Sequence, residues 1–228
     1  MLEYKINTIT LPMPFHLGWV NVFLLSTASG CLLIDTGSAS ARTKLLAELE
    51  RLGCTTGSLN LVLLTHGDYD HTGNAATLRA RFGTRLAMHR DDRGMAEQGD
   101  MFVNRQKPYF IARLLLPLLS GFGRKERFTP DLFVSNGYDL SAFGLEARIL
   151  SLPGHSKGSI GLLTASGDLF CGDLFENSKA PALNSLMDDP TAARASLETL
   201  KRLQIKTVYP AHGRPFEMDL LLRNISGA

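Results

Sequence analysis

Residues 59–74, LNLVLLTHGDYDHTGN, constrain the fold more strongly than any other part of the sequence. The first seven residues are mostly apolar, which is typical of a buried strand. This strand leads directly into His66, Asp68, Asp70 and His71, four residues of the types that bind metals or transfer protons. A loop at the end of a core strand is held by a rigid scaffold and is a usual place for functional residues. The segment therefore predicts a functional site at the end of a core strand.

The same arrangement recurs three times further along the chain. His155 follows the β-rich run ARILSLPG, Asp173 follows GDLFCG, and His212 follows KTVYPA. A catalytic divalent metal is held by histidine nitrogens and carboxylate oxygens, with one position left for water. A single histidine at a strand end would more simply be a hydrogen-bonded surface residue. Because four of the six histidines lie at such strand ends, we expect a metal site.

Strand and helix patterns alternate along the chain. β-rich runs cover residues 4–11, 20–26 and 31–37, and leucines at helical spacing predict a helix over 40–53 that stops at Gly53. A helix over 72–83 and a strand over 84–89 follow the 59–65 strand. Further strands are predicted within 138–155, 158–166, 167–173 and 206–213, with a helix over 191–204. No linker divides the chain, so we expect one α/β domain over 1–228, with a helical insertion at about 91–130.

Composition and charge exclude several function classes. The net charge is +2, and no basic run is interleaved with aromatic residues, so nothing supports a nucleic-acid partner. The most apolar stretch, residues 109–122, contains Arg113 and Pro117 and is too short to span a bilayer. The sequence starts with no signal-peptide pattern, and its three cysteines are widely spaced. We expect a cytoplasmic protein that acts on a small molecule.

Several motifs together resemble those of a known family. LTHGDYDHTGN, LPGHSKGSI, CGD and YPAHG are similar, in order and spacing, to the metal motifs of the metallo-β-lactamase-fold hydrolases. VNVFLLS and CLLIDTGS resemble the opening strands of that family. The resemblance covers the chain from about Asn21 to His212. It implies a four-layer αββα sandwich with a dinuclear metal site at one edge of the two sheets.

The resemblance also implies a role for each ligand-type residue. The first metal would be held by His66, Asp68 and His155, the second by Asp70, His71 and His212, and Asp173 would bridge them. A water or hydroxide held between the metals would be the nucleophile, because a bound metal lowers the pKa of water from about 15.7 to about 7. Asp70 is the candidate catalytic residue that would orient this water or move its proton.

Asp68 departs from the usual pattern, which is His-x-His-x-Asp-His. If Asp68 is a ligand, its oxygen shifts the preference of the first site from zinc towards manganese or iron, and its charge makes the bound water less acidic. Asp68→His would then increase zinc affinity. Alternatively, Asp68 is a turn residue that bonds local backbone and leaves a weaker or single-metal site. We expect two divalent metal ions, with zinc as the first candidate and manganese or iron as alternatives.

Three functions follow from this site. The first is a metal-dependent hydrolase of a thioester, lactone or related ester, since DHTGN is similar to the hydroxyacylglutathione hydrolases. The alternative is a di-iron or mono-iron oxidoreductase, because the related flavodiiron proteins carry a carboxylate at the place of Asp68. The third, a non-catalytic relative that binds a partner, is disfavoured because every ligand position is filled.

Candidates for substrate binding are less constrained. The 91–130 insertion offers an apolar and basic surface that would suit an acyl chain with an anionic group, and Lys157 follows His155 by two residues. Trp19 could reach the mouth of the site. The resemblance implies that Asp35 in the IDTGS turn supports the loop that carries the ligands. The insertion candidates are Phe102, Asn104, Arg105, Lys107 and Tyr109. Alternatively, the apolar part of the insertion packs on the core or against a second subunit in a homodimer.

Overall fold

The computed structural model describes residues 3–105, 115 and 121–226. The first half of the chain forms a six-stranded sheet in which neighbouring strands follow the sequence order. Its first three strands are antiparallel and the next three pairings are parallel. The strands are β1 (Tyr4–Pro12), β2 (Trp19–Thr27), β3 (Gly30–Ile34), β4 (Leu59–Leu63), β5 (Arg85–Met88) and β6 (Leu132–Phe133).

The second half of the chain forms a five-stranded sheet with the order β14-β12-β9-β8-β7. These strands are β7 (Ala147–Ser151), β8 (Ile160–Thr164), β9 (Asp168–Phe170), β12 (Thr207–Tyr209) and β14 (Phe216–Glu217). A small third sheet joins β10 (Phe175–Asn177) to β11 (Ala182–Leu183) and to β13 (His212–Gly213).

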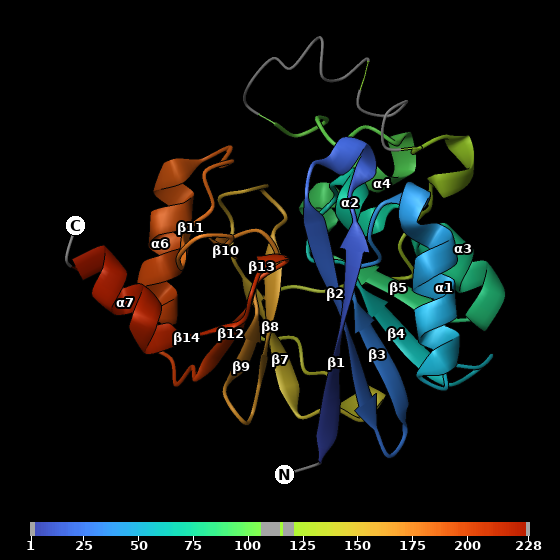
Figure 1. The fold of residues 1–228 in the computed structure, drawn as a ribbon, viewed down its shortest axis with the longest axis horizontal. Coiled ribbons are helices and arrows are strands. Elements are labelled where there is room, and N and C mark those ends of the chain that lie inside the picture. Colours follow the sequence, from blue (N-terminus) through green and yellow to red (C-terminus); the bar gives the residue numbers. More distant parts are fainter. Residues whose placement is uncertain (1–2, 106–114, 116–120, 227–228) are drawn as a thin grey trace.

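Helices cover the outer face of each large sheet (Figure 1). α1 (Arg42–Arg51) and α3 (Ala75–Phe82) lie on the first sheet, and α6 (Pro190–Leu200) and α7 (Met218–Ser226) lie on the second. Two shorter helices, α2 (Tyr69–Thr72) and α4 (Arg93–Gln98), belong to the first half. Single-turn 3₁₀ helices are formed by Pro14–His16, Ala39–Ala41, Arg90–Asp92, Arg124–Glu126 and Ser141–Phe143. The layers therefore follow the predicted αββα order.

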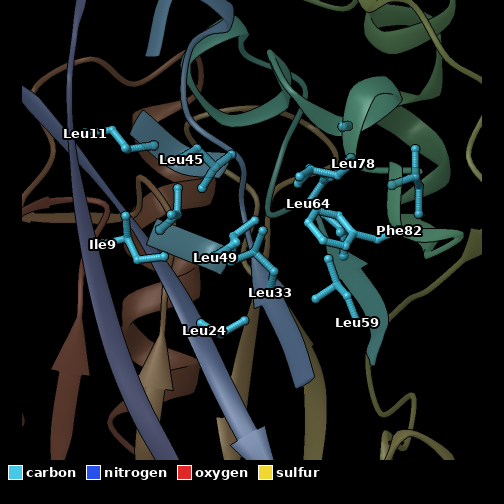
Figure 2. Packing of buried hydrophobic residues seen from close by; sticks show 14 of the residues in the cluster. Ile9, Leu11, Leu24, Leu33, Leu45, Leu49, Leu59, Leu64, Leu78 and Phe82 are labelled. Carbon is cyan, nitrogen blue, oxygen red and sulfur yellow. The ribbon is translucent and has the colours of Figure 1, made fainter. Parts of the chain in front are cut away.

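The alternation of side chains along β2 explains how the first sheet packs against a helix layer on one face and against the second sheet on the other. Val22 and Leu24 face α1, whereas Phe23 and Leu25 face the second sheet, because successive strand residues point to opposite faces. On the helix side, Leu45 and Leu49 of α1 are one helical turn apart and fully buried. Figure 2 shows Leu45 and Leu49 packed with Leu24 and other buried residues of the first sheet and α3.

Most of the predicted elements form near their expected positions. The predicted 72–83 helix is realised as α3, which ends where Gly83 adopts a left-handed φ of 69°. The predicted 191–204 helix begins at Pro190 and is capped by the Asp189 carboxylate, which accepts hydrogen bonds from the backbone N–H of Thr191 and Ala192. The small third sheet, β14 and α7 were not predicted. Within 91–130, α4 and two of the 3₁₀ helices are present, whereas most of the apolar stretch 109–122 lies outside the described residues.

None of the described helices combines the length and apolar character that crossing a membrane would require.

Candidate metal centre

The side chains predicted as metal ligands come together at the edge of the sheets where β4, β7, β9 and β12 end. Two groups have donor atoms that all lie within 4.8 Å of one another: His66, His155 and Asp173 in one, and Asp70, His71 and His212 in the other. Asp68 is next to the first group, with Oδ2 3.0 Å from His155 Nε2 and 3.7 Å from His66 Nε2. The second group has the members of the predicted second ligand set, whereas the first joins His66 and His155 to Asp173, the predicted bridge, with Asp68 beside them. Coordination by these residues stays a prediction.

Asp173 lies between the two groups, where a bridging carboxylate would be needed. Its Oδ1 is 3.4 Å from His71 Nε2, and its Oδ2 is 3.4 Å from His212 Nε2 and 3.7 Å from His155 Nε2. β9 positions this residue because it pairs in parallel with β12, which leads to His212. One carboxylate can therefore reach donors from both groups.

The Nδ1 atom of each histidine at the centre has a fixed partner, so Nε2 is the atom turned towards the centre. His71 Nδ1 is 2.9 Å from Asp35 Oδ2, and His66 Nδ1 is 3.0 Å from Thr65 Oγ1. The Thr65 hydroxyl in turn donates to Asp35 Oδ2 over 2.7 Å. Asp35 thus supports two histidines, one directly and one through Thr65, as expected for a residue that orients metal ligands.

The remaining two histidines are anchored to backbone carbonyls. His155 Nδ1 is 2.6 Å from the carbonyl oxygen of Leu186, and His212 Nδ1 is 2.9 Å from that of Trp19. A carbonyl oxygen can only accept, so each Nδ1 carries the proton and each Nε2 keeps a lone pair in the neutral form. This tautomer is the one that a metal bound through Nε2 requires.

Three buried atoms at the centre have no hydrogen-bond partner among the described residues: His66 Nε2, His71 Nε2 and Asp173 Oδ1. Buried polar groups without a partner are rare in folded proteins, and each requires an explanation. Imidazole nitrogens and a carboxylate oxygen that face one another are a donor set suited to a divalent metal. The residues present therefore fit the metal ions that the motifs imply.

The electrostatics of the centre are dominated by its carboxylates. Burial alone would lower the pKa of His71 and of His212, but Asp70 and Asp173 outweigh it and raise these values to about 10 and about 12. Conversely, burial would raise the pKa of Asp173, but His212 and His71 hold it well below its usual range. A metal that binds here must displace protons from these histidines.

Asp68 has a partner that the sequence analysis did not predict. Arg105 Nη2 donates to Asp68 Oδ1 over 2.5 Å, and both side chains are almost completely buried. Burial would raise the pKa of Asp68, but the Arg105 guanidinium and then His66 hold it well below its usual range. The two residues are 37 positions apart, and no sequence pattern links them. The side chain of Asp68 therefore bonds Arg105 and faces His155, whereas the alternative expected it to bond local backbone.

Asp92, also absent from the predicted site, joins the two ligand loops. Its fully buried carboxylate accepts hydrogen bonds from the Gly67 N–H, the Ser156 hydroxyl and the Gly158 N–H. A Cβ at Gly158 would lie 2.5 Å from Asp92 Oδ1, so the loop can approach this closely only with glycine. Asp92 follows β5 just as His66 follows β4, and this strand-end position is the signal that could have identified it.

A cleft of about 1250 Å³ opens above the centre. Asp68, Asp70, His155, Asp173 and His212 lie at its base. Its walls come from the β1–β2 connection and from the segments around residues 176–186 and 212–214. Trp19 lines it, as expected.

The predicted substrate contacts do not form its described wall. Asn104 bonds the Asp91 carbonyl, and the Lys157 side chain is 70% exposed with Nζ 3.9 Å from Asp91 Oδ2. Neither residue is among those that line the cleft. Tyr109 and Lys107 lie outside the described residues.

Comparison with known proteins supports the fold and the family. The model of the metallo-beta-lactamase superfamily matches residues 18–212. A metallo-beta-lactamase family protein of Thermus thermophilus has a similar structure, with a TM-score of 0.72, 26% identity, and coverage of 97% of this chain and 77% of that one. The protein TTHA1623, solved in a di-iron-bound form, gives a TM-score of 0.71 and 27% identity over 93% of this chain and 96% of that one.

Curated relatives are more distant or match a shorter part of the chain. Hydroxyacylglutathione hydrolase GloC of Haemophilus influenzae is 31% identical over 62% of this chain and 59% of its own. A beta-lactamase-like protein 2 homolog of Caenorhabditis elegans is 25% identical over 89% of this chain and 58% of its own. The chain thus spans about three-fifths of the length of these relatives. Since the family model matches most of its length, this chain belongs to the metallo-beta-lactamase superfamily.

Proposed function

We propose that this protein is a metal-dependent hydrolase of a thioester, lactone or related ester. One observation carries the proposal: four histidines with fixed Nδ1 atoms direct Nε2 towards shared carboxylates at the base of an open cleft. Family membership and the similarity to GloC agree with this chemistry.

Two metal ions would be held by the ligand sets already described. His66, His155 and Asp68 would hold one and Asp70, His71 and His212 the other, with Asp173 shared. Divalent metals in such a site supply an acidified water nucleophile and stabilise negative charge that develops on the substrate oxygen. The rest of the chemistry depends on the side chains of the chain itself.

Asp70 would orient the attacking water and accept its proton. Its carboxylate lines the cleft and is 19% exposed, and its Oδ2 lies 3.5 Å from His212 Nε2 and 3.6 Å from His71 Nε2. An accessible carboxylate next to the ligand set can accept a hydrogen bond from water and hold it in line with a substrate carbonyl. The more enclosed Asp173 lacks this freedom, because it faces histidines from both groups.

The cleft walls indicate an acyl group with apolar surface. Of the large apolar side chains described as exposed, four line this cleft: Phe15 (64% exposed), Leu17 (66%), Trp19 (60%) and Leu186 (73%). A cluster of exposed apolar side chains around one opening marks a binding surface, whereas scattered ones do not. These residues would bury the hydrocarbon part of a substrate whose carbonyl reaches the centre.

Two cations are also among the residues that line the cleft. Lys179 and Arg214 are exposed and line the cleft, and Arg214 follows His212 by two residues. They would attract a substrate that carries a carboxylate or phosphate group. We therefore propose an acyl substrate with both an apolar and an anionic part. An apolar and anionic substrate was also expected from the 91–130 insertion. The apolar and cationic residues that support it here lie outside that insertion.

Substitution at the two key carboxylates tests the proposal. Asp70→Ala and Asp173→Ala should each abolish turnover of a panel of acyl thioesters and lactones while leaving the far-UV circular dichroism spectrum unchanged. Asp219→Ala, an exposed change on α7 away from the cleft, is the matched control and should retain wild-type turnover. Turnover near wild type in either site variant would contradict the proposed centre.

The alternative is redox chemistry on iron. It is favoured by the di-iron-bound form of TTHA1623 and by the carboxylate of Asp68, since oxygen donors suit iron. Elemental analysis of protein purified without chelators or added metal separates the two functions. About two zinc or manganese ions per chain supports hydrolysis, whereas iron that changes oxidation state in air supports the oxidoreductase.

A further inference from the structure

Arg105 contacts the candidate metal centre without lining the cleft. Its side chain is 6% exposed. Nη2 donates to Asp68 Oδ1, Nη1 donates to the carbonyl oxygen of His155, and Nε donates to that of Met101 over 3.3 Å. One guanidinium thus joins the loop that carries Asp68 to the loop that carries His155.

This contact divides the Asp68 carboxylate between two tasks. Oδ1 accepts from Arg105, whereas Oδ2 is directed towards the centre, 3.0 Å from His155 Nε2. The backbone of Asp68 is held separately, because its carbonyl oxygen accepts the N–H of His71 and of Thr72. Only one oxygen is therefore available to a metal, as a histidine would offer only one nitrogen.

The charges of this pair also cancel. A histidine at position 68 would be neutral, whereas an aspartate adds one negative charge that the adjacent guanidinium offsets. We propose that Arg105 is a positioning residue that neutralises Asp68 and holds it as a one-oxygen donor, so that the pair replaces the neutral histidine of related motifs. This inference rests on the proposed metal site.

The inference reverses an expectation drawn from sequence alone. Asp68→His by itself would leave the Arg105 guanidinium buried beside a divalent cation without its anionic partner, which disfavours metal binding. Zinc affinity should increase only when Arg105 is replaced as well. Asp92 and Asp188 also interact electrostatically with Arg105, but both are present in every variant compared below.

The test measures metal affinity rather than turnover. Protein stripped of metal is titrated with zinc and with manganese against a chromophoric chelator, and stoichiometry is determined by elemental analysis. Arg105→Gln should bind the first-site metal at least about tenfold more tightly, because a positive charge a few ångströms away is removed. Arg105→Lys, which keeps the charge, should stay within about threefold of wild type. Asp68→His/Arg105→Gln should bind zinc at least about tenfold more tightly than Asp68→His alone.

Thermal unfolding provides a second readout. With chelator present, Arg105→Gln should unfold at a lower temperature than wild type, because Asp68 loses its partner and becomes an uncompensated buried charge. Added metal should raise its unfolding temperature by more than it raises that of wild type, because the metal becomes the cation beside Asp68. Arg51→Gln is the control, since Arg51 forms an exposed pair with Glu48 on α1, far from Asp68 in sequence, and should change neither value by much.

The possible results separate this inference from the proposed function. If wild-type protein binds no divalent metal, the proposed function fails. If wild type binds metal but folded Arg105→Gln binds it no more tightly, or Arg105→Lys gains as much as Arg105→Gln, charge cancellation is wrong. Should Arg105→Gln not fold without metal, the comparison of Asp68→His with the double variant, in which the pair carries no charge, still decides the question.

Discussion

Replacing Asp35 by asparagine would test whether second-layer hydrogen bonds set the histidine tautomers. Asp35 is 2% exposed and has a left-handed φ of 60°, a conformation that asparagine tolerates well. Its Oδ1 accepts the Thr65 N–H over 2.8 Å, and its Oδ2 accepts the Thr65 hydroxyl and faces His71 Nδ1. The substitution keeps size and backbone conformation and replaces one oxygen by an NH₂ group.

The hydrogen-bond pattern dictates how the amide must sit. The Thr65 N–H needs an acceptor, so the amide oxygen takes the Oδ1 position and the NH₂ group takes the Oδ2 position. The NH₂ group then donates to His71 Nδ1 and to the Thr65 hydroxyl, and this hydroxyl must donate to His66 Nδ1 instead. Both rings would be forced to carry their proton on Nε2, the atom that should bind the metal.

The substitution is expected to weaken metal binding strongly and to lower the stability of the metal-free protein as well. Loss of one oriented ligand through its outer partner costs about 10–100-fold in metal affinity. Because two rings are inverted, Asp35→Asn should weaken metal binding by at least about 100-fold, or about 2.7 kcal/mol. Without metal the substitution also removes one of the carboxylates that raise the pKa of His71. The free energy of unfolding should therefore fall as well, by about 1–3 kcal/mol.

The assay combines chelator competition with nitrogen-15 NMR of the histidine side chains, which reports the tautomer directly. Asp92→Asn is the matched control, because Asp92 is a buried carboxylate with three donors and no histidine contact. It should lower stability by about 1–3 kcal/mol without inverting a ring. Metal affinity of Asp35→Asn within threefold of wild type, or unchanged tautomers at His66 and His71, would refute the reasoning.

The remaining predictions concern pH and the core. Without metal, the raised pKa values of His71 and His212 mean that the folded state holds these protons more tightly than the unfolded state, whose histidines titrate near about 6.5. This stabilisation is complete below pH 6.5 and is lost as pH rises through about 10 and about 12, so thermal unfolding in chelator should occur at lower temperature at pH 9 than at pH 6. Metal requires unprotonated nitrogens, so the metal-induced rise in unfolding temperature should grow over the same range; a constant rise would contradict this assignment. In the core, Leu49→Ala removes a fully buried side chain between α1 and the first sheet and should cost about 2–5 kcal/mol in urea unfolding. A loss below about 1 kcal/mol would show that the site collapses around the smaller residue.

Local patterns were sufficient for most of the elements and for the strand-end positions of the candidate ligands. Apolar runs predicted most of the strands, and the position directly after a strand predicted where His66, His155, Asp173 and His212 would meet. The family resemblance, rather than a local pattern, implied that Asp35 supports the ligand loop, and its bonds to Thr65 and His71 agree with that expectation. The inferences from local patterns succeed because strand periodicity and strand ends are properties of short segments.

Contacts between segments that are distant in the sequence could not be predicted from such local patterns. Arg105 meets Asp68 across 37 positions, and nothing in the spacing of an insertion predicts which of its cations turns inwards. The cleft wall formed by the β1–β2 connection was anticipated only through Trp19, because exposed apolar residues in a turn have no periodic signature. Lys157 follows a ligand closely in sequence, yet its side chain leaves the centre for solvent.

The division of donors between the two sheets has a mechanical consequence. His66, Asp70 and His71 belong to the first half of the chain, and His155, Asp173 and His212 belong to the second. An ion that takes ligands from both would link the two halves of the chain at the edge where their sheets meet. Separation of the two halves would then require release of the metal. Chelation should therefore weaken the contact between the halves before either half unfolds.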